Sequence, residues 1–146
     1  MTNNKQIIEG LYQNMSERNL SKVLPALDEH LKIWVPKSLP FGGEFLGREG
    51  FIAMVSKINQ TWEYLKIAYL HYYLSEEISA DQLLVQGKML GKAFQADESY
   101  SFHFINQWRL RDNRIIEHRV FVDDTFELLH YLNKHTGNPS NLFHNH

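Results

Sequence analysis

The sequence predicts a single α+β domain in which a curved antiparallel sheet holds its helices on one face. Apolar residues recur at helical spacing in the first third of the chain, and long stretches with two-residue alternation follow from residue 61. A helical pattern returns near the C-terminus. Helices followed by a run of strands are typical of α+β architecture. We therefore expect a small-molecule pocket between the sheet and the helices.

Length and composition narrow the class of protein. The 146 residues correspond to one domain, and 43% hydrophobic with 22% charged residues is the balance of a folded protein. The formal net charge of -2 leaves no basic excess, so we expect no nucleic-acid partner. The absence of cysteine excludes disulfides and thiolate metal sites. We expect a cytoplasmic protein without a membrane partner, since neither a signal peptide nor a long apolar stretch is visible.

Helices are predicted at four places. A short one follows Ser21, with Pro25 in its first turn, and a third begins near Arg48. The last begins near Asp124 or Thr125 and ends before residue 137, so residues 1–136 form the domain and 137–146 a short C-terminal tail. The first helix has its apolar face formed by Ile7, Ile8, Leu11, Tyr12 and Met15.

Strands are predicted from alternation and from the residues that interrupt it. A short strand covers residues 31–35, and the glycine- and proline-rich residues 36–50 are predicted to form a loop at the pocket rim. Asp112 and Asn113 form a tight hairpin turn, because Asn tolerates left-handed backbone. The long strands are 61–74, 83–94, 99–110 and 114–122.

Strand alternation predicts which polar side chains face the interior. Asn106 shares the aromatic face of its strand with Phe104 and Trp108, where it could orient a ligand or bond to a neighbouring strand or subunit. His118 lies on the more apolar face of the last long strand, where it could shuttle protons or serve as a core histidine held by one hydrogen bond. We add Trp34, from the first strand, to the predicted ligand-binding residues.

Three stretches carry a resemblance to a known family. Residues 43–51 are similar to a loop that enters a helix through a Gly-Arg-Glu step. Residues 108–117 are similar to a Trp-x-x-x-Asp-Gly-Lys-Ile hairpin, with Asn113 and Arg114 in place of Gly and Lys. Residues 118–129 are similar to a strand that ends in Asp before a helix with a Leu-Leu pair. In this order they resemble the SnoaL-like and ketosteroid-isomerase-like branch of the nuclear transport factor 2-like superfamily.

This resemblance implies a cone-shaped barrel with a deep apolar pocket, usually dimeric. Members of the superfamily include cyclases, isomerases, epoxide hydrolases, dehydratases and binding proteins without activity. Steroid isomerases carry a general-base Asp before a Pro at the end of the first strand, where this chain has Val35. SnoaL-like cyclases place a catalytic Asp at the end of the last strand. Counting from the hairpin gives Asp123 and counting from the Leu-Leu pair gives Asp124, so both stay open.

The predicted chemistry is acid/base proton transfer without a cofactor. A carboxylate at the mouth of an apolar pocket has a raised pKa that suits proton transfer, although an Asp before a helix is also a common N-cap. The predicted function is an isomerase, cyclase or dehydratase of an apolar or aromatic molecule; the alternative is a non-catalytic ligand-binding or dimerisation module. The predicted partners are that small apolar molecule and a second copy in a homodimer.

The eight histidines show no metal-ligand spacing, so no metal site is expected. The predicted catalytic residues are Asp123, Asp124 and His118, and the predicted ligand-binding residues are Asn106, Trp108, Phe104, Trp34 and Phe45.

Overall fold

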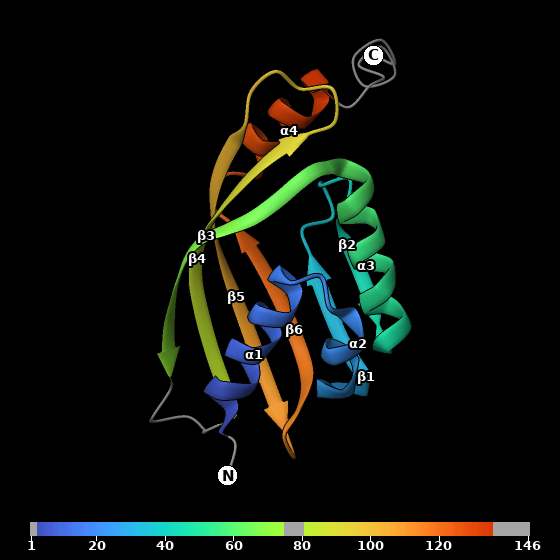
Figure 1. Ribbon diagram of the computed structural model, residues 1–146, viewed down its shortest axis with the longest axis vertical. Coiled ribbons are helices and arrows are strands. Elements are labelled where there is room, and N and C mark those ends of the chain that lie inside the picture. Colours follow the sequence, from blue (N-terminus) through green and yellow to red (C-terminus); the bar gives the residue numbers. More distant parts are fainter. Residues whose placement is uncertain (1–2, 75–80, 136–146) are drawn as a thin grey trace.

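A curved six-stranded sheet with helices on one side forms the protein, whose computed structural model describes residues 3–74 and 81–135 (Figure 1). The predicted α+β class is confirmed. In Figure 1 α1 and α2 lie in front of the strands, α3 lies alongside β1 and β2, and α4 lies beside the end at which β5 begins. The elements in chain order are α1 (Asn4–Ser16), α2 (Leu20–Val23), the short 3-10 helix η1 (Leu24–Ala26), β1 (Leu27–Val35), β2 (Gly43–Leu46), α3 (Gly47–Thr61), β3 (Trp62–Leu74), β4 (Gln82–Ala93), β5 (Tyr100–Arg111), β6 (Arg114–Val122) and α4 (Thr125–His135).

The sheet has the strand order β2-β1-β6-β5-β4-β3. Three long antiparallel pairings, β3 with β4, β4 with β5 and β5 with β6, form a meander. One pairing departs from the predicted antiparallel sheet, because β1 runs parallel to β6. After β2 and α3 the chain enters the sheet at the opposite edge, and the meander then returns to β1 with β6 running in the same direction as β1.

Residues 36–50 are not wholly a loop, because they contain β2, which pairs antiparallel with β1. The strand is only four residues long and glycines flank it, so it shows too little alternation to be recognised. Gly47 has a positive φ of 69°, and a Cβ there would lie 2.9 Å from the carbonyl oxygen of Glu29. Glycine therefore permits the close turn between β2 and α3.

The ends of the first helices differ in part from the prediction. The sequence predicts Asn3 or Asn4 as the N-cap of the first helix, and Asn3 caps α1 in a reciprocal capping box with Gln6. Asn19, and not Ser21, precedes α2, and this helix ends before Pro25, which lies in η1. The sequence also predicts a turn at residues 79–81, of which residues 79 and 80 lie outside the described residues, as do residues 136–146 with the predicted helix stop.

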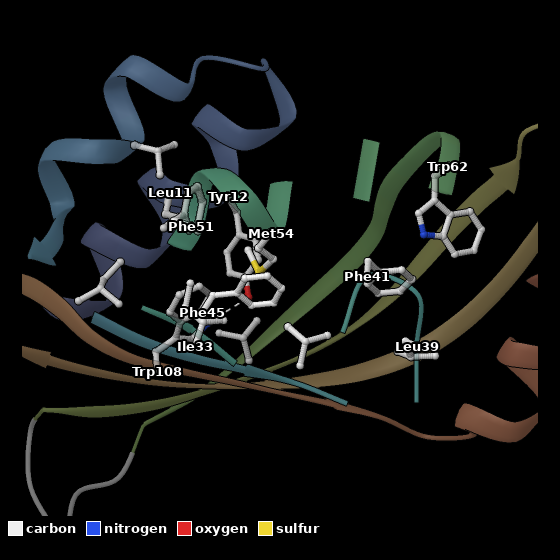
Figure 2. Close-up of a cluster of buried hydrophobic side chains, with 14 of the residues drawn as sticks. Leu11, Tyr12, Ile33, Leu39, Phe41, Phe45, Phe51, Met54, Trp62 and Trp108 are labelled. Atoms are coloured by element: carbon white, nitrogen blue, oxygen red, sulfur yellow. Dashed lines mark hydrogen bonds between the residues drawn. The ribbon is translucent and has the colours of Figure 1, made fainter. Parts of the chain in front are cut away.

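The core lies between the inner face of the sheet and helices α1, α3 and α4 (Figure 2). One part of it, around Trp108, lies below α1 and α3, and another part, around Trp62, lies farther along the sheet. Each large apolar side chain buried here contributes about 1.5–3 kcal/mol relative to an exposed one. The hairpin between β5 and β6 has the predicted turn, since Asp112 and Asn113 have positive φ angles of 52° and 64°.

Candidate functional site

The inner face of β5 carries the residues from which a site can be built. Its buried residues alternate with exposed ones, as the sequence indicated. Asn106 is a polar side chain on this face, and only 5% of its surface is exposed. A buried amide needs hydrogen-bond partners, because transfer out of water without them is unfavourable. The partners of Asn106 therefore decide what this part of the interior can do.

Asn106 and Trp108 both donate hydrogen bonds to the hydroxyl oxygen of Tyr12, a buried residue of α1. The distances are 2.7 Å from Asn106 Nδ2 and 3.1 Å from Trp108 Nε1. The Tyr12 ring also stands edge-on to Trp108, with ring centroids 5.8 Å apart. Burial raises the pKa of Tyr12, so its hydroxyl keeps its proton. Neither of the two hydrogen bonds uses that proton, which remains available to an acceptor.

His118 lies next to this group, on the neighbouring strand β6. It is the cross-strand partner of Trp108, and the two rings stack with centroids 3.8 Å apart and an angle of 8° between their planes. Burial lowers the pKa of His118 to about 3, so the imidazole is neutral at pH 7. We refer to Tyr12, Asn106, Trp108 and His118 as the Tyr12 cluster.

The Tyr12 cluster has more hydrogen-bonding capacity than the described residues satisfy. Neither ring nitrogen of His118 has a partner among them, and neither does Asn106 Oδ1. A neutral imidazole supplies one donor and one acceptor, the amide oxygen supplies a second acceptor, and the Tyr12 hydroxyl supplies a second donor. Each buried unpaired group costs about 1–3 kcal/mol of stability. The cluster can therefore bind a small group that both donates and accepts hydrogen bonds.

The two candidate carboxylates lie elsewhere. Asp124 Oδ1 accepts a hydrogen bond of 2.9 Å from the backbone N–H of Glu127, which makes Asp124 the cap of α4. Asp123 is exposed, with Oδ2 3.7 Å from Nδ1 of His103 on the outer face of β5. The structure thus brings His118 to Asn106 and Trp108 but brings neither aspartate to them. Their predicted catalytic role stays a prediction without geometric support.

The other predicted ligand-binding residues are spread over both faces of the sheet. Phe104 is buried on the inner face of β5, where its ring lies so close to Gly87 that a Cβ there would be 2.6 Å from Cζ. Phe45 is buried in β2 against the first turn of α3. Trp34 lies on the outer face, with the Arg119 guanidinium 4.2 Å from its ring centroid. The structure therefore separates Trp34 from the Tyr12 cluster.

Tyr12 is the member of the cluster that sequence reasoning did not identify as a site residue. The helical pattern places it on the apolar face of the first helix together with aliphatic residues. The one available signal was its hydroxyl, which must find a partner when the face is buried. Nothing in the local sequence indicated that the partners are 94 and 96 residues away.

Residues 3–74 and 81–135 contain neither a metal-ligand cluster nor a membrane-spanning helix. Within these ranges no group of three or more His, Cys, Asp or Glu side chains could hold a metal ion. In the same part of the chain, no helix has the length and apolar character needed to cross a membrane.

Comparison with known families decides the identity of the fold. A family model described as the SnoaL-like domain matches residues 8–118. The chain belongs to the SnoaL-like family. The match includes every member of the Tyr12 cluster of this SnoaL-like protein and ends before Asp123 and Asp124. No curated protein has a sequence similar enough to match the chain.

Solved structures share the fold of this SnoaL-like protein at low sequence identity. An NTF2-like protein of unknown function from Burkholderia pseudomallei is 22% identical, with a TM-score of 0.80 over 90% of this chain and 98% of that one. TerC, crystallised with polyporic acid, is 16% identical, with a TM-score of 0.78 over 88% and 97%. A candidate polyketide cyclase from Xanthomonas campestris is 14% identical, with a TM-score of 0.73 over 88% and 95%. These similarities support the fold and do not assign an activity.

Proposed function

We propose that this SnoaL-like protein binds a small, flat, mostly apolar molecule whose hydroxyl group pairs with the Tyr12 cluster. One observation carries the proposal: Asn106 Oδ1 and both ring nitrogens of His118 are buried without a partner among the described residues. Unsatisfied buried polar groups are uncommon in folded proteins and often mark a functional site. The aromatic surroundings of these atoms favour a ligand with an aromatic frame.

A ligand hydroxyl has the hydrogen-bonding pattern that the cluster lacks. It can donate to Asn106 Oδ1 or to the unprotonated nitrogen of His118, and its oxygen can accept from Tyr12. Two proteins of the same fold support a small-molecule role, since TerC was crystallised with polyporic acid and another is a candidate polyketide cyclase.

Proton transfer at His118 is the chemistry that we propose for this site. A neutral imidazole can accept a proton from an enol or phenol and return it to another atom, which is the acid/base step of an isomerisation, cyclisation or dehydration. With a pKa of about 3, His118 is a weak base in the unliganded protein. A developing negative charge on the ligand would stabilise the imidazolium and raise this pKa. The reaction needs no cofactor at this site.

Calorimetric titration with two matched probes tests the binding proposal. We expect para-hydroxybiphenyl to bind about tenfold more tightly than para-methoxybiphenyl, because only the phenol can donate a hydrogen bond. His118→Leu and Asn106→Leu should remove most of this preference, whereas His103→Leu, a matched change on the outer face, should keep it. Equal affinity of the wild-type protein for both probes, or no binding of either, would contradict the proposal.

A dimerisation role is a second candidate, favoured by the outer face of the sheet. Two cross-strand pairs on this face are apolar or aromatic and exposed: Tyr73 with Leu84, and Ile105 with Phe121. A second copy of the chain would bury these side chains. Sedimentation equilibrium should then show a dimer that Ile105→Lys dissociates. Phe126→Lys, at an exposed position of α4, should leave the dimer intact, and a monomeric wild-type protein would refute this candidate.

A further inference from the structure

Another buried polar atom without a hydrogen-bond partner among the described residues lies in the part of the core around Trp62. Trp62 begins β3 and has only 2% of its surface exposed. Its indole Nε1 has no hydrogen-bond partner among the described residues. The N–H of a buried tryptophan usually has a partner, so this one requires an explanation.

The packing around Trp62 holds the indole in one orientation. Phe102 and Tyr131 both stack on it, each with a centroid distance of 6.1 Å and with interplanar angles of 26° and 17°. Gly91 lies against the ring, since a Cβ there would be 2.7 Å from Trp62 Cε3. Figure 2 shows the indole nitrogen on the edge of the ring nearer to Phe41. The N–H direction is therefore set by the fold before any ligand arrives.

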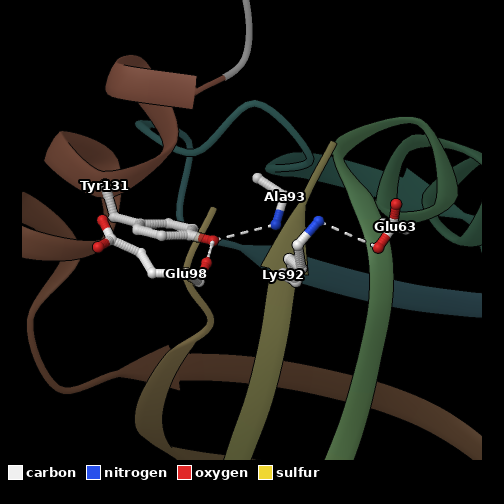
Figure 3. A network of polar contacts seen from close by, with 5 residues as sticks. All are labelled: Glu63, Lys92, Ala93, Glu98 and Tyr131. Atoms are coloured by element: carbon white, nitrogen blue, oxygen red, sulfur yellow. Dashed lines mark hydrogen bonds and ion pairs between the residues drawn. The ribbon is translucent and has the colours of Figure 1, made fainter. Parts of the chain in front are cut away.

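Nearby polar side chains are committed to other bonds. The Tyr131 hydroxyl accepts from the Ala93 N–H at 3.1 Å and donates to the Glu98 carbonyl at 2.7 Å (Figure 3). Thr61 donates to the Lys57 carbonyl. An indole N–H is a donor only, so it requires an acceptor. In these apolar surroundings the acceptor must be neutral, because an isolated carboxylate would lose too much hydration energy.

Strand β5 connects the surroundings of Trp62 with the Tyr12 cluster. Phe102, which stacks on Trp62, and Asn106, which belongs to the Tyr12 cluster, are four residues apart on the inner face of β5. At about 3.4 Å per residue, Phe102 and Asn106 are about 14 Å apart along the strand, which is comparable to the length of two linked aromatic rings with a substituent at each end. Phe104 lies between them on the same face.

We propose that Trp62 is a second polar anchor of the ligand-binding site, and that the ligand is an elongated aromatic molecule with a hydroxyl at one end and a neutral carbonyl or ether oxygen at the other. The hydroxyl pairs with the Tyr12 cluster, and the Trp62 N–H donates to the oxygen at the far end. This inference rests on the proposed function, to which it adds the length of the ligand and the polarity of its second end.

Matched probes and one substitution test the anchor. The first probe, para-hydroxy-para′-acetylbiphenyl, has both polar ends, and the second, para-hydroxy-para′-ethylbiphenyl, lacks the carbonyl. We expect the acetyl probe to bind the wild-type protein about five- to tenfold more tightly, as one hydrogen bond to a buried donor provides. Trp62→Phe keeps the ring and removes the N–H, so it should abolish this difference. Trp34→Phe, on the outer face, should preserve it.

A second measurement uses the wild-type protein alone, so the test does not depend on how well the variant folds. In a ¹H–¹⁵N spectrum the Trp62 indole N–H should move downfield on addition of the acetyl probe and not on addition of the ethyl probe. If both hydroxylated probes bind through the Tyr12 cluster with equal affinity and the Trp62 signal responds to neither, the anchor is refuted and the proposed function stands. If neither probe binds, the proposed function fails and the anchor fails with it.

Discussion

Burial of His118 makes the stability of the protein depend on pH in a way that can be calculated. Burial lowers the pKa of His118 to about 3, whereas a histidine in the unfolded chain has a pKa of about 6.5. Between these two values the unfolded state binds more protons than the folded state. Stability is therefore retained above pH 6.5 and lost as the pH falls. From pH 7 to pH 5 the loss attributable to His118 is about 2 kcal/mol.

Substitution of His118 by Leu isolates this contribution from those of the other titrating groups. The variant lacks the titrating imidazole, so its free energy of unfolding should fall about 2 kcal/mol less than that of the wild-type protein between pH 7 and pH 5. At pH 7 the variant should be about as stable as the wild-type protein or more stable. The variant loses the stacking on Trp108, which contributes about 0.5–1.5 kcal/mol. It also loses two buried nitrogens that have no partner in the described part of the chain and that cost about 1–3 kcal/mol each.

Urea denaturation of both proteins at pH 7, 6 and 5, followed by far-ultraviolet circular dichroism, measures the difference directly. A difference between the two proteins that does not change with pH would show that water reaches the imidazole. The reasoning about the Tyr12 cluster would then be refuted. Titration of the imidazole by NMR provides an independent check, since the His118 ring should stay neutral at pH 5.

Three further predictions concern the fold around the site. Tyr12→Phe removes the acceptor of two buried donors, so it should lower the free energy of unfolding by about 2–4 kcal/mol in urea denaturation. Tyr73→Phe, at an exposed position, should change it by less than about 0.5 kcal/mol. Similar effects of the two substitutions would contradict the buried network. Asp124→Ala should destabilise the protein by about 1 kcal/mol, because the cap of α4 is lost. Asp123→Ala should destabilise it by at most about 0.5 kcal/mol. The reverse order of the two effects in calorimetric melting would show that Asp124 is not the cap. Gly87→Ala should lower the melting temperature by several degrees, because a Cβ would be 2.7 Å from the backbone oxygen of Tyr69. Such overpacking lowers the free energy of unfolding by about 1–3 kcal/mol. An unchanged melting temperature would refute this close packing.

Part of the candidate site could be predicted from the sequence. Alternation along a strand is a local property, and it placed Asn106, Trp108 and His118 on the inner face of the sheet, where the structure has them. The site role of Tyr12 could not be predicted in the same way, because its partners come from a strand far away in the chain. The role of Asp124 as a helix cap was one of two alternatives that local sequence left open.

The sequence by itself determined the local conformation of this protein. Helical and alternating periodicity placed the starts of α3 and α4 and the bounds of β4, β5 and β6 close to those observed, and the residue types at Asp112 and Asn113 determined the hairpin turn. These features depend on the steric preferences of residues that lie within a few positions of one another in the sequence. Only the tertiary structure decided the parallel pairing of β1 with β6, the short strand β2 and the assembly of the Tyr12 cluster. Each of these joins segments that are distant in the chain, or depends on a partner strand for its hydrogen bonds, so no local pattern specifies it.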